Sequence, residues 1–455
     1  MTKIAVIGAG SLAWSTTLVR DLCLTPSLKN STISFVDINE ERLNLIYTFA
    51  KRYASEVKAE LNFEKTTNRR EAIEGADFVI NTAMAGGHSY YETMREVSEK
   101  YGYYRGINSV EWNMVSDYHT IWGYYQFKLA LSIAKDIEEL SPEAWLLQLG
   151  NPVFELTTLI SRETKTNVIG LCHGHLGYQE IAMTLGLKPK EVEFEAIGFN
   201  HVIWLTKFKY ENKDVYPLID EWIKKNSKEY WKRWREEQAN PFDIQMSPAA
   251  VDMYKTYGLF PVGDSVRGGT WKYHWNLETK KNWFGPLAGP DSEIGWALYL
   301  TFQKFNLGNI VSAINNPKVP LTNVVPPEIS QESVVPIIES IAFDKEGTYQ
   351  VNVVNKGVIS SLPDDIVVEI PAKVDEKGVH RISVEKLPKS IINYVLYPRM
   401  MRAEWALEAF LEGGRDKLFE WLIIDPRTKS TEQVNQVIDA ILSLPGNEEM
   451  ANHFK

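Results

Sequence analysis

Two short stretches of the chain carry side chains that could bind a metal ion. Residues 172–175 read Cys-His-Gly-His, and residues 200–201 read Asn-His. A thiolate is a soft ligand, and imidazole suits many first-row metals. Taken singly, a cysteine is more often a small core hydrophobe, but the clustering of these groups favours a metal site. Two protein ligands would leave an ion open to substrate hydroxyl groups, as Lewis-acid chemistry requires.

A glycine-rich turn near the start of the chain fits a dinucleotide site. Residues 8–13 read Gly-Ala-Gly-Ser-Leu-Ala, between an apolar run and a helical pattern. In this GxGxxG/A pattern Gly8 permits the tight turn, and Gly10 lets the backbone approach a pyrophosphate. The helix that starts after Ser11 offers free N–H groups to the phosphates. A purely structural glycine turn is the alternative, but the strand and helix context favours nucleotide binding.

Polar residues at the ends of two later apolar runs agree with this cofactor. Asp37 lies 27 residues beyond Gly10 and ends the second run. A carboxylate there can accept hydrogen bonds from the adenine ribose, and its charge disfavours a 2′-phosphate, so we expect NAD rather than NADP. Asn81 and Thr82 end a further run, where the sheet would place them beside the ribose and nicotinamide. An ordinary loop is the alternative for this pair.

The first 185 residues alternate short β-rich runs with helical patterns, which predicts a parallel sheet covered on both faces. We expect strands at residues 4–7, 32–36, 77–82, 145–148 and 168–171, and helices at 12–24, 40–57 and 121–139. The fold class is therefore α/β, with a Rossmann-like doubly wound parallel sheet. Cys172 directly follows a strand, so we expect it at the same sheet edge as the glycine turn.

The pattern changes after about residue 190. We expect strands at 193–198, 202–210, 349–355 and 365–371, a helical stretch at 222–234, ordered loops over 240–290, and a helical tail over 389–444 with breaks at 413–414 and 425–426. The chain shows no sharp linker. We therefore expect an NAD-binding Rossmann-like domain over residues 1–190, closely packed against an α+β domain over residues 191–455 for substrate, metal and oligomerisation.

Composition narrows the class of partner. Of 455 residues, 44% are apolar and 24% charged, and the formal net charge is −10. Nucleic acid and anionic membranes are disfavoured, because phosphate neutralisation needs a basic stripe and none is visible. The two cysteines, Cys23 and Cys172, argue against a disulfide-stapled secreted domain. No apolar run is long enough to span a bilayer and no signal peptide precedes the first strand, so we expect a cytoplasmic protein.

Together these motifs resemble glycoside hydrolase family 4, a group of NAD- and metal-dependent glycosidases outside the usual two-carboxylate scheme. The resemblance spans essentially the whole chain. It is carried by residues 8–11, 81–83, 103–107, 113–118, 151–152, 172–175, 198–201, 247–250, 261–267 and 425–429.

The resemblance implies a redox-assisted mechanism. Cys172 and His201 would hold the divalent metal, usually manganese in this family. Hydride transfer from sugar C3 to NAD would give a ketone that the metal polarises, and the C2 proton would become acidic. Removal of that proton, elimination of the glycosidic oxygen, addition of water and reduction of the ketone would complete the cycle.

The resemblance also implies catalytic and substrate-binding residues. Asp117 and Asp264 would serve as acid and base, with the assignment between the two left open; from the residues alone, either could be a helix cap or a turn residue. Asn151 and His173 are the expected substrate contacts. Arg267 is a further candidate, although an arginine there could instead pair with a carboxylate.

The residue after the metal-ligand cysteine correlates with substrate in this family. Phosphoglycosidase branches resemble Cys-Asp or Cys-Asn, whereas this chain has His173, which is similar to the branch of α-glucosidases and α-glucuronidases. Residues 83–88 look closer to the α-glucosidases, so we expect a small-molecule α-glucoside as substrate. An α-glucuronide or α-galacturonide is the alternative, with Arg267 or Lys272 facing the carboxylate.

Two other classes of protein share the amino-terminal pattern. An NAD-dependent hydroxy-acid dehydrogenase of malate or lactate type would release NADH and would not need the Cys172 and His201 pair. A non-enzymatic NAD sensor would have no reason to keep these ligands. The family resemblance favours the glycosidase and implies a homodimer or homotetramer.

Overall fold

The computed structural model describes residues 1–103, 122–237, 245–267, 278 and 293–455. The amino-terminal part forms a parallel sheet in the order β6-β5-β4-β1-β2-β3. Its strands are β1 (Lys3–Ile7), β2 (Thr32–Val36), β3 (Asn62–Thr66), β4 (Phe78–Asn81), β5 (Trp145–Gln148) and β6 (Asn167–Gly170).

Helices cover both faces of this sheet. They are α1 (Leu12–Cys23), α2 (Glu40–Val57), α3 (Arg69–Ile73), α4 (Gly87–Lys100), α6 (Tyr124–Leu140) and α7 (Val153–Glu163). Side chains of β1 alternate between the two faces, as the pleat requires. Ile4 and Val6 pack in the core beside α1 and α2, whereas Ala5 and Ile7 pack in the core beside α6. This arrangement confirms the doubly wound parallel sheet.

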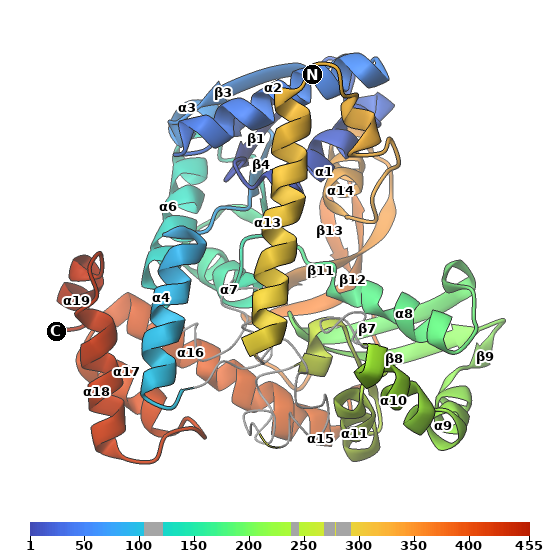
Figure 1. The fold of residues 1–455 in the computed structure, drawn as a ribbon, viewed down its shortest axis with the longest axis vertical. Coiled ribbons are helices and arrows are strands. Elements are labelled where there is room, and N and C mark those ends of the chain that lie inside the picture. Colours follow the sequence, from blue (N-terminus) through green and yellow to red (C-terminus); the bar gives the residue numbers. More distant parts are fainter. Residues whose placement is uncertain (104–121, 238–244, 268–277, 279–292) are drawn as a thin grey trace.

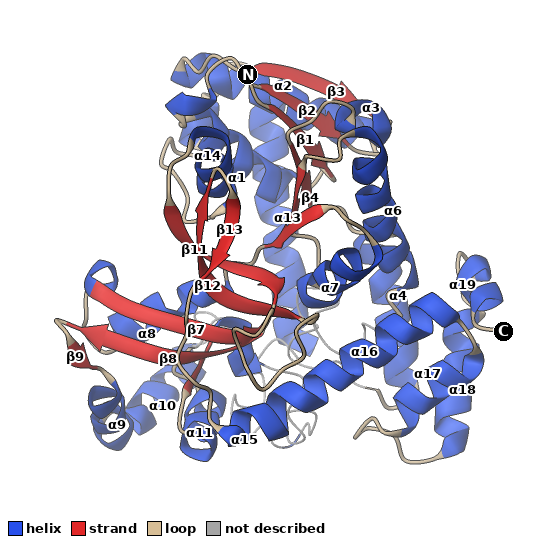
Figure 2. Ribbon diagram, turned by 180° about the vertical axis from the view of Figure 1, so that it is seen from behind, coloured by secondary structure: helices blue, strands red, loops and turns tan. Residues whose placement is uncertain are grey.

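The sheet continues into an antiparallel part. β11 (Gly347–Val354) pairs with β6 and with β12 (Val367–Asp375), and the order then runs β12-β7-β8-β10. The other strands here are β7 (Val192–Phe199), β8 (Val202–Tyr210), β9 (Lys213–Asp214), β10 (Phe260–Val262) and β13 (Gly378–Arg381). Figure 2 shows β7 and β8 crossing below β11 and β12. The division of the chain near residue 190 stays a prediction.

The remaining helices surround this extension and the lower end of the molecule. They are α8 (Gly177–Thr184), α9 (Tyr216–Lys225), α10 (Ser227–Glu237), α11 (Pro248–Tyr257), α13 (Glu293–Asn315), α14 (Val334–Phe343), α15 (Lys389–Ile391), α16 (Tyr397–Glu412), α17 (Arg415–Ile423), α18 (Thr431–Leu442) and α19 (Glu448–His453). Short helical turns include η3 (Gly174–Leu176) and η5 (Gly263–Arg267). In Figure 1, α13 crosses the front of the sheet, and α18 lies beside α4.

Two sequence expectations are corrected. The helical stretch predicted at 222–234 is interrupted at Asn226, which separates α9 from α10. The predicted loops over 240–290 contain α11 and β10 instead. Pro248 begins α11 at a position where proline fits a helix, with Ser247 as the capping residue before it. Among the described residues, we find no helix with the length and apolar character needed to cross a bilayer.

Candidate active site

The glycine turn between β1 and α1 is tight and lies close to the neighbouring strand ends. Gly8 has a φ of +84°, and a Cβ there would lie 2.6 Å from the backbone nitrogen of Ala83. The N–H groups of Gly8 and Ala9 both donate to the carbonyl of Val36, at 2.9 and 3.0 Å. Only glycine fits this close approach with this backbone conformation. The turn is therefore fixed against the ends of β2 and β4.

The Asp37 carboxylate closes the turn from the other side. Oδ2 accepts from the backbone N–H of Gly10 at 2.7 Å, and Oδ1 accepts from that of Asn39 at 2.8 Å. A Cβ on Gly10 would lie only 2.5 Å from Oδ2. Asp37 is half-buried, and a carboxylate offers about four lone-pair sites. Room is therefore left on Asp37 for the hydroxyl groups of a ribose. Ser11 is exposed at the start of α1, and its side chain makes no capping hydrogen bond.

Asn81 and Thr82 lie at the sheet edge beneath the glycine turn. Asn81 is buried; its Nδ2 donates to Gln148 Oε1 at 2.9 Å, and its Oδ1 accepts from the N–H of Ala83 at 3.1 Å. The Thr82 hydroxyl donates to the carbonyl oxygens of Ile7 and Gly8, at 3.1 and 3.2 Å. Both side chains therefore support the turn from within the protein. Their direct contact with a cofactor stays a prediction.

Two residues far apart in the chain meet at the carboxyl end of β6. Cys172 follows β6, and His201 lies in the tight turn between β7 and β8 with a φ of +62°. The Sγ of Cys172 lies 3.4 Å from Nε2 of His201. Asp264, at the start of η5, places its Oδ2 3.4 Å from the same nitrogen. His201 and Asp264 are buried, at 6% and 9% exposed.

This arrangement has the donor set and spacing of a two-ligand metal site. With the bond lengths of zinc, about 2.3 Å to sulfur and 2.1 Å to nitrogen, two ligands of one ion would lie roughly 3.1–3.6 Å apart. The Sγ to Nε2 distance of 3.4 Å falls within that interval. Within the described part of the chain, no group of three or more histidine, cysteine or acidic side chains is arranged to hold a metal. Cys172 and His201 therefore fit a pair of metal ligands among the described residues.

Two glycines bring the loops of the site together. Gly263 has a φ of +63°, and a Cβ on it would overlap the carbonyl of Gly174. Gln245 is buried between these loops; its Oε1 accepts from the N–H of Gly263 at 2.7 Å. The hydroxyl of Ser265 accepts from the N–H of Ile203 at 2.6 Å. These contacts fix the segment that carries Asp264 against the loops that carry Cys172 and His201.

The expected substrate-contacting residues are described only in part. His173 is exposed, and its Nδ1 lies 3.1 Å from Oε1 of Glu332. Asn151 is half-buried and precedes a cis peptide bond to Pro152. Arg267 ends η5, and its side chain is outside the described atoms. The second predicted catalytic acid, Asp117, lies outside the described residues.

The side chain of His175 packs in the interior and hydrogen-bonds to the backbone of Cys172. It is 8% exposed, and its ring stacks on Phe194 at 6.1 Å between centroids. Burial, followed by the charge of His173, lowers the pKa of His175 to about 4. The imidazole is therefore neutral near pH 7 and packs as part of the interior.

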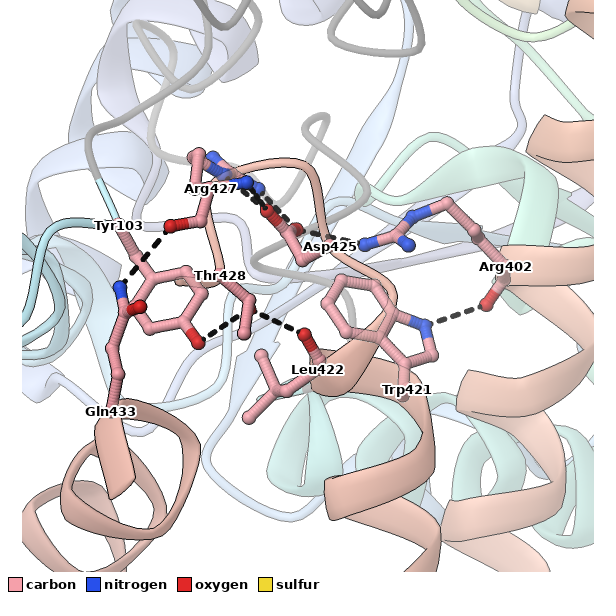
Figure 3. Close-up of polar contacts among 8 residues, drawn as sticks. All are labelled: Tyr103, Arg402, Trp421, Leu422, Asp425, Arg427, Thr428 and Gln433. Atoms are coloured by element: carbon pink, nitrogen blue, oxygen red, sulfur yellow. Dashed lines mark hydrogen bonds and ion pairs between the residues drawn. The ribbon is translucent and has the colours of Figure 1, made fainter. Parts of the chain in front are cut away.

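A buried cluster near the carboxyl terminus holds Tyr103, which directly precedes residues 104–121 (Figure 3). The hydroxyl groups of Tyr103 and Thr428 are 2.7 Å apart. Asp425 accepts from Arg427 at 2.8 and 2.7 Å and from Arg402 at 3.0 Å. The carboxyl-terminal motif at 425–429 therefore anchors Tyr103.

Sequence reasoning missed one acidic residue close to the site. Glu369 lies in β12, is 1% exposed, and accepts a hydrogen bond from Asn200 at 2.9 Å. The only signal in the sequence is a single carboxylate inside the apolar run Ile-Val-Val-Glu-Ile at 366–370. This pattern indicates that Glu369 is buried, but it does not identify its partner Asn200, which lies 169 positions away.

The chain matches two family models that together cover most of its length. The model described as "Family 4 glycosyl hydrolase" matches residues 3–187, and that described as "Family 4 glycosyl hydrolase C-terminal domain" matches residues 196–428. These matches define the protein as a glycoside hydrolase. The chain belongs to glycosyl hydrolase family 4, as the sequence motifs predict.

Curated relatives of this chain act on different sugars. An alpha-galactosidase of Bacillus subtilis is 24% identical, with 96% of each chain covered. An alpha-galacturonidase of Thermoanaerobacter italicus is 25% identical over 93% of this chain and 91% of the relative. An alpha-glucosidase of Erwinia rhapontici is 25% identical, with 97% of each covered.

Solved structures of similar fold span the full chain. A 6-phospho-alpha-glucosidase from gut microorganisms, in complex with NAD and Mn²⁺, has a TM-score of 0.76 at 18% identity, with 100% of each chain covered. A 6-phospho-beta glucosidase from Thermotoga maritima, with manganese, NAD⁺ and glucose-6-phosphate, has a TM-score of 0.71 at 20% identity and the same coverage. These similarities confirm the predicted fold class.

Proposed function

We propose that this protein is an α-glycosidase that depends on NAD and a divalent metal, with an α-glucoside as substrate and Mn²⁺ as the metal. The observation that carries the proposal is the convergence of Cys172 Sγ and Asp264 Oδ2 on His201 Nε2, each at 3.4 Å. This cluster adjoins the carboxyl end of β6, and the glycine turn lies at the same edge of the parallel sheet. The NAD and manganese bound by two structures of similar fold support this assignment.

Each candidate residue has a separate role in the proposed reaction. When bound, NAD would accept and return the hydride of sugar C3, and the metal would polarise the oxygen at that carbon, which acidifies the C2 proton. Asp37 would bind the adenine ribose, and Cys172 with His201 would hold the metal. Asp264 is buried beside these ligands, where it would exchange a proton with the sugar or its leaving group. Asp117 would be the partner acid or base.

The substrate proposal favours a neutral sugar. Glu332 lies 3.1 Å from His173, which is the predicted substrate contact. A carboxylate at that position disfavours the carboxylate of a uronic acid, because like charges repel. The relatives that act on galactosides and galacturonides keep those two sugars as the alternatives to be tested. Family membership favours the glycosidase over a net dehydrogenase or an NAD sensor. A homodimer or homotetramer, and a cytoplasmic location, stay predictions.

The test of the metal assignment is Cys172→Ser. We expect the variant to lose Mn²⁺-dependent hydrolysis and Mn²⁺ binding while its affinity for NAD is unchanged. Cys23→Ser is the matched control, because burial raises the pKa of the Cys23 thiol to about 12 and no thiolate is available there. Hydrolysis at the wild-type rate by Cys172→Ser without added metal would refute the assignment.

A further inference from the structure

The strand behind the Asn200-His201 turn carries a buried carboxyl group. Glu369 in β12 is 1% exposed, and Asn200 is 4% exposed. The Nδ2 of Asn200 donates to Oε2 of Glu369 at 2.9 Å. Asn200 immediately precedes His201, whose φ of +62° is unusual for a residue other than glycine. A single hydrogen bond therefore connects the interior of β12 to the turn that presents the imidazole.

The register of the sheet places Glu369 between the two ligand loops. Gly170 in β6 pairs with Asn352 in β11, Asn352 pairs with Glu369, and Glu369 pairs with Gly198 in β7. Cys172 follows Gly170 by two positions, and His201 follows Gly198 by three. A Cβ on Gly170 would lie 2.8 Å from the Cβ of Asn352. This row of residues therefore crosses the sheet from one ligand loop to the other.

The carboxyl group is costly to bury. Burial raises the pKa of Glu369 to about 7, although the amides of Asn200, Asn352 and Gln350 and the charge of His173 oppose that rise. Within the described ranges, no lysine or arginine forms an ion pair with Glu369. A buried polar group destabilises a fold unless its interactions compensate. Because ion pairing does not compensate Glu369, we look for the role of this residue in its hydrogen bonds.

We propose that Glu369 is a positioning residue for the metal site: by accepting the hydrogen bond from Asn200, it fixes the Asn200-His201 turn and directs Nε2 of His201 toward Sγ of Cys172. This inference rests on the proposed function, because it takes Cys172 and His201 as the metal ligands. Outer partners of metal ligands orient them, and their loss typically weakens metal binding by about 10- to 100-fold.

The test measures the affinity for Mn²⁺ alone, from the electron paramagnetic resonance signal of the free ion. We expect Glu369→Ala to raise the Kd for Mn²⁺ by about 10- to 100-fold and to leave the Kd for NAD unchanged. Glu369→Gln keeps an oxygen that can accept from Asn200, so its Kd for Mn²⁺ should stay close to that of the wild type. A change in Mn²⁺ affinity without a change in NAD affinity separates positioning of the ligand from general destabilisation.

A double-variant cycle tests the connection itself. Asn200→Ala removes the donor, so it should weaken Mn²⁺ binding as Glu369→Ala does, and the double variant should bind no more weakly than the weaker single variant. If Glu369→Ala fails to fold, Asn200→Ala measures the same connection from the turn between β7 and β8. Glu195→Ala is the matched control, because Glu195 is also buried in this sheet but accepts from Thr206 at 2.6 Å and from the N–H of Glu385 at 2.9 Å.

The outcomes separate this inference from the proposed function. A folded Glu369→Ala with wild-type Mn²⁺ affinity overturns the positioning role while the metal site stands. Additive effects in the double variant, or an equal loss in Glu195→Ala, overturn it as well. A wild-type protein that binds no Mn²⁺ overturns the metal site and the inference together.

Discussion

Asp37 fixes the glycine turn and is also the predicted ligand of the adenine ribose. Its two carboxylate oxygens accept from the N–H groups of Gly10 and Asn39, which fixes the glycine turn before any cofactor arrives. The resemblance and the position of Asp37 at the end of β2 predict a further contact with the adenine ribose. The residue is therefore expected to affect cofactor affinity through the shape of the turn and through direct binding.

Replacement of this carboxylate tests the role of Asp37 in binding NAD. Asp37→Ala should raise the Kd for NAD by at least about tenfold, because a hydrogen bond to a charged group contributes about 1.5–3 kcal/mol. The matched control is Asp77→Ala, which removes a carboxylate that accepts from the N–H of Lys3 at 2.8 Å before β4 begins. Calorimetric titration with NAD gives both constants. An Asp37→Ala protein with unchanged affinity would show that the ribose is bound elsewhere.

At the residue scale, the sequence shows which residue types could do chemistry, but it does not show which of them lie close together. Cys172 and His201 stand out because their residue types suit a metal, and the structure places them 3.4 Å apart. Asp264 approaches His201 because β10 pairs with β8. The two residues are 63 positions apart in the chain, so the sequence does not indicate this contact. Glu369 was missed for the same reason, since its partner Asn200 lies in the turn between β7 and β8, 169 positions away.

The contact between Gly174 and Gly263 joins η3 to η5 and so completes the site. Gly263→Ala should push these turns apart, because its Cβ would overlap the carbonyl of Gly174 and its φ is +63°. We expect a loss of hydrolysis of at least about tenfold and a fall in Tm, because overpacking costs about 1–3 kcal/mol.

A substitution at a second glycine distinguishes the effect of steric overlap from the effect of backbone strain. Gly258 has a φ of +82° but no atom within 4 Å of a Cβ built on it, so Gly258→Ala carries only the cost of backbone strain. Hydrolysis by Gly258→Ala should stay near the wild-type rate. Equal rates in the two variants would show that the approach of η3 to η5 is unimportant for catalysis.

At the element scale, apolar runs in the sequence predict the strands inside the sheet well, but they do not reveal a polar strand at its edge. The predicted strands at 32–36 and 145–148 agree with β2 and β5 at both ends. β3 was not predicted, because its five residues are polar or half-exposed at the edge of the sheet. The pairing of β6 with β11 could not be predicted either, because its partners Gly170 and Asn352 are far apart in the chain and each strand pattern fits several neighbours.

At the scale of the whole molecule, buried charge holds the carboxyl-terminal helices α16 and α17 together, and a hydroxyl contact of Thr428 joins them to Tyr103. The cluster around Asp425 joins α16 and α17 to Tyr103, as Figure 3 shows. Burial alone would raise the pKa of Asp425, but the charges and hydrogen bonds of Arg427 and Arg402 hold it below its usual value. The ionised carboxylate is therefore the form that stabilises the folded state.

The sign of this shift predicts the effect of pH on stability. Because the folded pKa is lowered, the contribution of Asp425 is fully present above its unfolded pKa of about 3.9 and is lost as the pH falls through the folded value. Asp425→Asn should lower the free energy of unfolding at pH 7 by about 3–5 kcal/mol, as expected for a broken buried pair. The difference in the free energy of unfolding between Asp425→Asn and the wild type should become smaller toward pH 3.

Thermal unfolding of both proteins between pH 3 and pH 7 measures this difference. Asp375→Asn is the control, because Asp375 forms its ion pair with His380 at the surface, where screening by solvent makes such pairs weak. Its Tm should follow that of the wild type. A constant gap between Asp425→Asn and the wild type across this pH range would show that the charge of Asp425 is not what stabilises the fold.

The most direct measurement is hydrolysis of p-nitrophenyl α-glucoside, α-galactoside and α-galacturonide, with NAD, Mn²⁺ and thiol present together or omitted one at a time. We expect release of p-nitrophenol from the α-glucoside only when all three are present, without net formation of NADH, because the cofactor is reduced and reoxidised in each turnover. Preference for another sugar would correct the substrate. Hydrolysis without NAD, or accumulation of NADH in proportion to substrate, would contradict the redox-assisted glycosidase.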